Sequence, residues 1–180
     1  MIRLLAISGS LRAVSTNTTL LKAAIALAPA VMTIDLWDGL GGLPHFNPDL
    51  DIDPLPPAVA AWRGRVAEAD GLLISSPEYA RGVPGSLKNA LDWLVSGPEH
   101  PGKPVAFFHA SERGVASQAA LRLIAETMGM RVIDTASVTI PLLGTQTQIE
   151  EIAADQILAR RIRAALDAYG AALAATQTAR

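Results

Sequence analysis

The chain has 180 residues, of which 50% are hydrophobic, and its formal net charge at pH 7 is −2. This length and composition are typical of one domain with a substantial core, and the near-neutral charge gives no general attraction to nucleic acid or to an anionic membrane. The sequence contains no cysteine, which excludes disulfides, thiolate nucleophiles and cysteine-ligated metal centres, so any redox chemistry needs a bound organic cofactor.

Strands and helices are predicted to alternate along the chain. Short apolar or β-branched runs favour strands, and Ala- and Leu-rich stretches with capping residues favour helices. In chain order we predict a strand over 2–7, a helix over 17–28, a strand over 31–36, a loop over 37–57, a helix over 58–69, a strand over 71–76, a helix over 85–95, a strand over 104–110, a helix over 116–128, an irregular fifth strand over 132–140 and one long helix over 149–174.

This alternation predicts an α/β fold with a parallel sheet covered by helices on both faces, as a three-layer α/β/α sandwich. We expect a single domain over 1–180. Ligands of such sheets bind outside the carboxyl ends of the strands, so the loops over 8–18, 75–86 and 110–117 are the candidate site.

A cytoplasmic location is expected. The first predicted strand begins within two residues of the N-terminus, which leaves no room for a signal peptide. No apolar run reaches the roughly 18 residues that a membrane span needs.

The loop SGSLRAVSTNT (8–18) has the composition of a phosphate site. It joins a strand to a helix and is rich in Ser, Thr and Asn donors, with Arg12 as the cation. It lacks the lysine of a Walker loop and the glycines of a dinucleotide fingerprint. The same side chains also suit plain helix capping, and Arg12 with its context favours the phosphate interpretation.

The loop SSPEYARGVPGSLKN (75–89) is suited to bind a planar ring. Pro77 and Pro84 restrict its path into the next helix and place Glu78 and Tyr79 at the rim of the sheet. The alternative is a surface loop whose tyrosine only covers a helix edge. A phosphate at one loop and a planar ring at the other correspond to flavin mononucleotide.

Together these motifs resemble the NAD(P)H-dependent FMN reductase family of flavodoxin-like proteins. The resemblance lies in GSLRAVSTN (9–17), in SPEYARGVPGSLKNALDWL (76–94) and in LGGLPHFNPDLD (40–51). It implies a five-stranded parallel sheet in the order 2-1-3-4-5 and a non-covalent FMN. One departure is SERGVASQ (111–118), which places Glu112 and Arg113 where members often have a Gly-rich stretch.

The resemblance also implies the cofactor-binding residues. On the phosphate these are Ser10, Arg12, Ser15, Asn17 and Thr18, and at the isoalloxazine Pro77, Glu78, Tyr79, Ser111 and Gly114. No catalytic side chain and no metal are expected, because hydride transfer occurs between nicotinamide and flavin.

The implied activity is hydride transfer from NADPH or NADH to FMN and then to a small-molecule acceptor: free flavin, a quinone, an azo compound or an oxidised metal. A homodimer or homotetramer is expected, without a nucleic-acid or membrane partner. In such an assembly the loop over 37–50, with Trp37, His45 and Phe46, would bound the pocket of a neighbouring subunit.

Several alternatives stay open. An electron-transfer flavoprotein without nicotinamide activity is one, although the near-neutral charge and Arg12 argue against it. A phosphate-ligand sensor or scaffold is another.

Two roles also stay open for single residues. His109 ends a strand near the expected flavin, where its role is either proton delivery or purely structural. Lys88 and Asp92 are spaced as a solvated ion pair on one helix, a helix that family members bury in a dimer interface.

Overall fold

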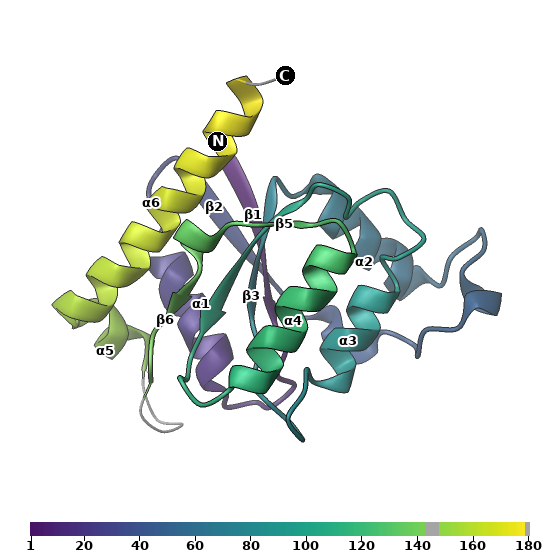
Figure 1. Ribbon diagram of the computed structural model, residues 1–180, viewed down its shortest axis with the longest axis horizontal. Helices are drawn as coiled ribbons and strands as arrows, with labels where there is room; N and C mark the ends of the chain where they lie inside the picture. Colours follow the sequence, from purple (N-terminus) through teal and green to yellow (C-terminus); the bar gives the residue numbers. More distant parts are fainter. Residues whose placement is uncertain (143–147, 179–180) are drawn as a thin grey trace.

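The computed structural model describes residues 1–142 and 148–178. Figure 1 shows one layered α/β body. The strands are β1 (Ile2–Ser8), β2 (Met32–Trp37), β3 (Gly71–Ser75), β4 (Pro104–His109), β5 (Arg131–Val132) and β6 (Val138–Thr139). The α-helices are α1 (Thr16–Ala26), α2 (Pro57–Glu68), α3 (Gly85–Asp92), α4 (Val115–Thr127), α5 (Ile149–Ala154) and α6 (Gln156–Thr178). Short 3₁₀ turns are η1 (Gly39–Gly42), η2 (Pro48–Leu50) and η3 (Asp134–Ala136).

The sheet is parallel and has the order β2-β1-β3-β4-β5, which confirms the predicted fold class. Its two faces carry two hydrophobic cores, one beneath α1, α5 and α6 and the other beneath α2, α3 and α4. Both faces of the sheet are therefore buried against hydrophobic side chains, which explains why the strands are near-continuous apolar runs.

The strands β1 and β3 end at the same level of the sheet. Ser8 pairs with Ser75 at the last step of their ladder, and the next amide, Gly9 N, donates to Ser75 O at 2.8 Å. A side chain at Gly9 would come within 2.7 Å of Ser76 Oγ. Glycine at this position therefore lets the first two loops of the candidate site leave the sheet in close contact.

The fifth strand is interrupted, as its irregular sequence predicted. β5 and β6 each have two residues and both pair with β4, while η3 bulges out between them. Ser137 stabilises the bulge, because its hydroxyl donates to Ile133 O at 3.1 Å and accepts from Phe107 N at 3.1 Å. This side chain replaces the ladder hydrogen bond that the bulge removes.

The prediction of one helix over 149–174 is wrong, because the helix breaks at Asp155. The Asp155 carboxylate accepts from Ile157 N at 2.8 Å and Leu158 N at 3.0 Å, so it caps a new helix. Aspartate is among the strongest N-cap residues, and the Ala-rich composition conceals this local signal. No helix in the described part of the chain is both long and apolar enough to cross a bilayer, the 23-residue α6 included.

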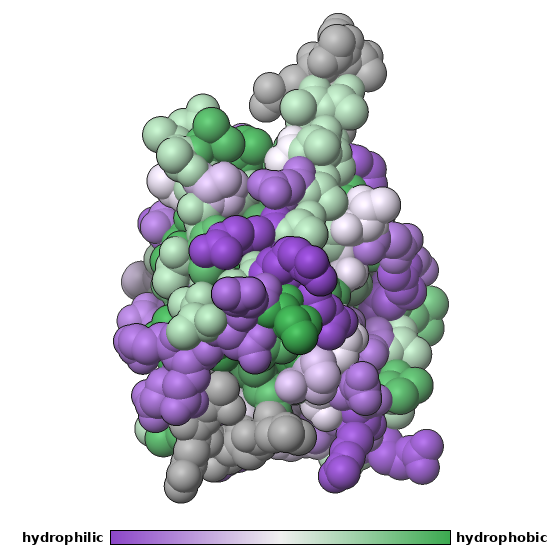
Figure 2. Space-filling model, turned by 90° about the vertical axis from the view of Figure 1, so that its left-hand side faces the viewer, coloured by the Kyte–Doolittle hydropathy of each residue, from purple (hydrophilic) through white to green (hydrophobic). Residues whose placement is uncertain are grey.

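Helix α6 is fixed to the sheet by a buried tyrosine. Tyr169 Oη lies 2.9 Å from Leu72 O and 2.8 Å from Pro104 O, and a side chain at Gly71 would collide with it. Burial raises the pKa of Tyr169, so its hydroxyl stays protonated as a donor. On the outer side of α5 and α6, hydrophilic and hydrophobic side chains alternate without one broad hydrophobic area across the middle (Figure 2).

Helix α3 holds the long loop that follows β2. Asn89 accepts from Phe46 N at 2.7 Å and donates to Pro44 O at 2.9 Å, and Trp93 Nε1 donates to the same carbonyl at 2.8 Å. Phe46 also packs edge-to-face on Trp93. The residues of the motif LKNALDWL thus position the segment over 43–46 within this chain.

Candidate functional site

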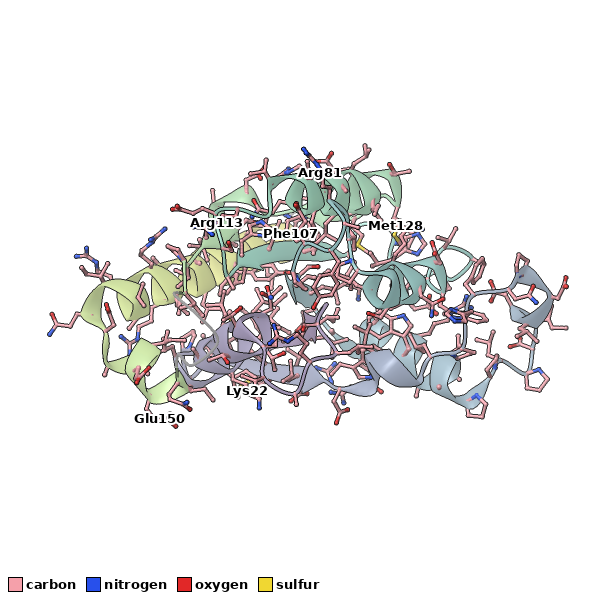
Figure 3. The ribbon with its side chains drawn as sticks, turned by 90° about the horizontal axis from the view of Figure 1, so that it is seen from below. Lys22, Arg81, Phe107, Arg113, Met128 and Glu150 are labelled. Carbon is pink, nitrogen blue, oxygen red and sulfur yellow. The ribbon has the colours of Figure 1, made fainter. Side chains whose placement is uncertain are left out.

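Three loops meet at the carboxyl edge of the sheet, after β1, β3 and β4. Figure 3 views this edge from below and labels Arg81 on the loop after β3 and Arg113 on the loop after β4. The loops are those predicted from the order of the elements, because parallel strands direct all their carboxyl ends to the same edge.

The first loop is organised by short polar side chains. Ser15 is the N-cap of α1, accepting from Thr18 N at 3.4 Å, and Thr18 in turn shares a 2.8 Å hydrogen bond with Ser8. Ser10 Oγ accepts from Arg12 N at 3.3 Å. The capping interpretation therefore holds for Ser15, while the free amides of the first turn of α1 still face the loop and attract an anion.

Asn17 and Arg12 differ in how they are held. Asn17 is buried and accepts from Ser75 Oγ at 3.0 Å, which ties α1 to the end of β3. Arg12 is exposed, and within residues 1–142 and 148–178 it forms no ion pair. Arg12 therefore keeps its guanidinium available for an anion beside the N-terminus of α1.

The second loop contains a tight and strained turn. Tyr79 and Gly82 exchange both backbone hydrogen bonds, at 3.1 and 2.9 Å, and Ala80 and Arg81 between them have φ angles of 49° and 60°. Two successive positive φ angles are the arrangement of a type I′ turn, which favours Asn and Gly. This chain places two residues with Cβ atoms there, at a conformational cost on the order of 1 kcal/mol each.

The second loop is clamped to the start of α4. Gly114 at the N-cap has no side chain, and the Glu78 carboxylate takes its place by accepting from Ser117 N at 2.9 Å. Ser117 Oγ also donates to Pro77 O at 3.2 Å. A carboxylate at a helix N-terminus is favoured by the helix dipole, so Glu78 has a structural role in addition to its place at the rim.

A cavity of about 320 Å³ lies between the three loops. It is within the size range of small-molecule sites. Of the predicted residues the structure brings together Asn17, Pro77, Glu78, Ser111 and Gly114 in its lining. The other lining residues are Thr16, Ser76, His109, Ala110, Arg113 and Gln118.

The remaining predicted residues line adjacent hollows. Ser10, Arg12 and Thr18 border a 200 Å³ hollow towards β2, and Ser15 and Thr18 border one of 230 Å³ towards α5. Tyr79 is half-exposed and shares an open groove with Arg12. The predicted residues therefore line several neighbouring hollows around the first loop, and they do not all line one closed pocket.

The cofactor-binding residues expected from the sequence do not include Thr16, Ser76 or Gln118, which also line the cavity. Gln118 Nε2 donates to Ser111 O at 3.0 Å and so supports the third loop. The sequence could have indicated Gln118, because this residue lies one helical turn after Gly114 and so on the side of α4 that faces the third loop. Ser76 directly precedes Pro77, and Thr16 directly precedes Asn17, so both were adjacent to selected residues.

His109 ends β4 and lines the cavity. Burial, and to a smaller extent the positive charge of Arg122, lower the pKa of His109 to about 4. The imidazole is therefore neutral at neutral pH, and it does not supply an imidazolium for proton delivery. Its ring lies 6.0 Å from that of Phe107, nearly parallel to it.

The donor set fits a flavin mononucleotide. The start of α1 stands at one side of the cavity, with Arg12 on the adjacent hollow, and the loops after β3 and β4 border the cavity at the other side. No cluster of three or more potential metal ligands occurs within the described residues.

The chain is similar in sequence to proteins that are named as reductases. Residues 2–143 match the family model described as NADPH-dependent FMN reductase. An NAD(P)H-dependent FMN reductase of Pseudomonas aeruginosa is 46% identical over 112 residues, covering 61% of this chain and 60% of the relative. A 2-hydroxy-1,4-benzoquinone reductase of Burkholderia sp. is 46% identical over 92 residues, covering 51% of this chain and 49% of the relative. The matched segment thus spans about half to three fifths of these relatives' own length.

Solved structures extend the likeness over nearly the whole chain. FerB, a flavoenzyme NAD(P)H:(acceptor) oxidoreductase from Paracoccus denitrificans, superposes with a TM-score of 0.73 at 28% identity, covering 95% of this chain and 98% of its own. The apo form of an NADH:FMN oxidoreductase superposes with a TM-score of 0.68 at 22% identity, covering 96% of this chain and 90% of its own, which supports the fold alone.

Proposed function

We propose a function from one premise, which is that the chain belongs to the NADPH-dependent FMN reductase family. We infer that it is an FMN-dependent oxidoreductase that takes electrons from NADPH or NADH and passes them to a small-molecule acceptor. The observation that carries this proposal is the 320 Å³ cavity at the carboxyl edge of the sheet, which the N-terminus of α1 lines and next to which Arg12 borders a second hollow.

The first loop would hold the phosphate of FMN. The amides at the start of α1 supply directed donors, and Arg12 supplies a charge-assisted contact from an exposed position. The hydroxyl network of Ser8, Ser10 and Thr18 keeps the loop in this conformation before ligand binds. The proposed phosphate residues are Ser10, Arg12, Ser15, Asn17 and Thr18.

The second and third loops would hold the isoalloxazine ring. The clamp between Glu78 and Ser117 fixes their relative position, and the Gln118–Ser111 contact fixes the third loop. Backbone held in this way orients a ring without reorganisation during the reaction. The proposed ring residues are Pro77, Glu78, Tyr79, Ser111 and Gly114.

FMN, when bound, supplies the redox chemistry by accepting a hydride and returning electrons to a second substrate. The chain contributes orientation and exclusion of water, and His109 stays neutral near the cavity. A quinone is the acceptor that the names of the relatives favour, since a 2-hydroxy-1,4-benzoquinone reductase and a quinone reductase of Escherichia coli are among them.

We propose a single domain over 1–180, because both hydrophobic cores share one sheet. The assembly is proposed to be a homodimer or a homotetramer, through hydrophobic residues exposed on the α3–α4 side of the molecule. NADPH and NADH are metabolites of the cytoplasm, so we propose that the protein works there.

Titration of the purified protein with FMN, followed by flavin fluorescence, tests the cofactor site. We expect Arg12→Ala to weaken FMN binding about tenfold, because a charge-assisted contact to phosphate is lost. Arg160→Ala, an exposed arginine of α6, is the matched control and should leave FMN binding unchanged. Equal binding by all three proteins would remove Arg12 from the phosphate site.

Anaerobic addition of NADPH and NADH to the FMN-loaded protein tests the activity. Bleaching of the visible flavin absorbance, followed by turnover when a quinone is added, is the expected result. Bound flavin that stays oxidised would instead favour an electron-transfer flavoprotein, and a protein that binds no FMN would favour a phosphate-ligand sensor or scaffold.

A further inference from the structure

The third loop brings a positive charge to the lining of the 320 Å³ cavity. Among the described lining residues this charge is that of Arg113, and its neighbour Glu112 is not one of them. Arg113 is exposed, and within the described part of the chain it forms no ion pair. The guanidinium of Arg113 is therefore available to a group that enters the cavity.

The fold holds the backbone of Arg113 in place. Arg113 N donates to Ser111 Oγ at 3.1 Å, and Ser111 O accepts from Gln118 Nε2 at 3.0 Å. The next residue, Gly114, is the N-cap of α4. Because the loop is fixed on both sides of Arg113, a contact with a ligand requires ordering of the arginine side chain alone.

The other titratable side chains of the cavity leave this charge without a counter-charge. Burial lowers the pKa of His109 to about 4, so its imidazole is neutral at neutral pH. The Glu78 carboxylate accepts from Ser117 N at 2.9 Å, at the start of α4. This amide and the positive end of the helix dipole offset the negative charge of Glu78. The charge of Arg113 thus favours a ligand that is negative or becomes negative in the cavity.

Reduction adds a negative charge to the cofactor that is proposed to occupy this cavity. A hydride carries two electrons and one proton, so the ring of FMN gains one negative charge while the nicotinamide, which loses the hydride, becomes a cation. A quinone that takes the hydride and one solvent proton leaves as the hydroquinone, which restores the neutral ring. A cation beside the ring stabilises the charged reduced form more than the neutral oxidised form.

We propose that Arg113 stabilises the negatively charged reduced form of bound FMN and so makes the reduction potential of bound FMN more positive. This inference rests on the proposed function and adds a residue that sets the balance between the two redox states. Ser111 and Gly114, on either side of Arg113, belong to the proposed ring site. Arg12 belongs to the proposed phosphate site, and hydride transfer does not change the charge of the phosphate.

The affinities of the protein for oxidised and for reduced FMN test the inference. Anaerobic titrations with FMN and with dithionite-reduced FMN give two dissociation constants, and their ratio fixes the difference in potential between bound and free FMN. For Arg113→Ala we expect the affinity for reduced FMN to fall about tenfold, while the affinity for oxidised FMN stays within about twofold. A tenfold change in this ratio lowers the potential of bound FMN by about 30 mV for a two-electron couple.

Two further variants separate the charge from the structure of the loop. Arg113→Lys keeps the positive charge, so we expect it to restore most of the potential. Arg160→Ala removes an exposed arginine of α6 and should leave both affinities unchanged. Melting temperatures without FMN show whether each variant is as stable as the wild type. In a variant of equal stability, a selective loss of affinity for reduced FMN comes from the missing charge, and a structural role alone does not produce it.

Two outcomes would overturn the proposal. Equal losses of affinity for oxidised and reduced FMN, complete loss included, would show that Arg113 holds the cofactor in both redox states. Equal potentials of bound FMN in the wild type and in Arg113→Ala would leave the arginine as a solvated surface residue. In both cases the wild type binds FMN and the proposed function stands, whereas a wild type that binds no FMN overturns the inference and the function together.

Discussion

Among the residues that line the cavity, His109 is the one whose pKa the fold lowers. The unfolded chain takes up a proton on this histidine below about pH 6.5, while the folded protein does so only near pH 4. Stability therefore falls as the pH drops through this window and does not recover below it. Because the ring is partly exposed, we expect the loss to be on the order of 2 kcal/mol.

The His109→Gln variant should lose this part of the pH dependence. Urea unfolding at about pH 6.5 and about pH 4 gives the change in the free energy of unfolding for wild type and variant. Carboxylate groups titrate in both proteins, so their contribution cancels when the two changes are subtracted. His45→Gln, on an exposed part of the loop after β2, is the control and should behave as the wild type. Equal slopes for wild type and His109→Gln would show that the imidazole is solvated in the folded state.

At the scale of single residues, the sequence predicted which loops form the candidate site. It did not predict which partner each side chain contacts. Arg12 and Asn17 both follow from a polar loop before a helix, yet only the structure shows that Asn17 accepts from Ser75. Likewise Glu78 was expected at the ring, and the structure adds its cap on α4. Such contacts join residues 39 or 58 positions apart, so local patterns cannot reveal them.

At the level of elements, α3 supports the loop after β2 through two side chains of one face. Replacing Asn89 by alanine removes both the acceptor for Phe46 N and the donor to Pro44 O. These backbone groups are partly buried, so we expect a loss of about 1–3 kcal/mol in the free energy of unfolding. Chemical denaturation measures this loss.

Lys88→Ala on the same helix is the matched control. Its ion pair with Asp92 is exposed, as the sequence indicated, and pairs of this kind contribute about 0–1 kcal/mol. The Asn89 variant should therefore be clearly less stable than the Lys88 variant. Similar losses in both would mean that the segment over 43–46 holds its position without α3.

The strands and the first four helices followed from composition because each is a continuous apolar or Ala-rich run between polar loops. The C-terminal region did not, since Asp155 caps a helix inside an Ala-rich stretch where periodicity alone predicts continuity. The split of the last strand into β5 and β6 was anticipated only as irregularity, because the hydroxyl of Ser137 that holds the bulge acts on β4, 30 residues earlier.

At the scale of the molecule, the exposed hydrophobic side chains differ between the two helical layers. On the α4 side Val115 and Leu123 are 64% and 65% exposed, and Val95 after α3 is 58% exposed. On the opposite layer Ile157 of α6 is 63% exposed, in a face where hydrophilic and hydrophobic side chains alternate (Figure 2). Val14 before α1 and Val31 before β2 are also exposed, so the difference lies on the helices themselves: among the large hydrophobic residues that are exposed, α4 carries two and α6 carries one. A helix with more exposed hydrophobic residues is the stronger candidate for an association surface.

This difference predicts which substitution separates the subunits of the proposed assembly. Leu123→Glu places a charge in the α3–α4 surface, so we expect a shift towards monomers in light scattering or sedimentation, with FMN still bound because Leu123 is not among the residues that line the cavity. Ile157→Glu introduces the same charge on α6 at the same exposure and should leave the mass unchanged. If Ile157→Glu alone dissociates the assembly, its interface lies on the C-terminal helix instead. A wild-type protein that is monomeric at all concentrations tested would contradict the assembly itself and leave Leu123 as a solvated residue.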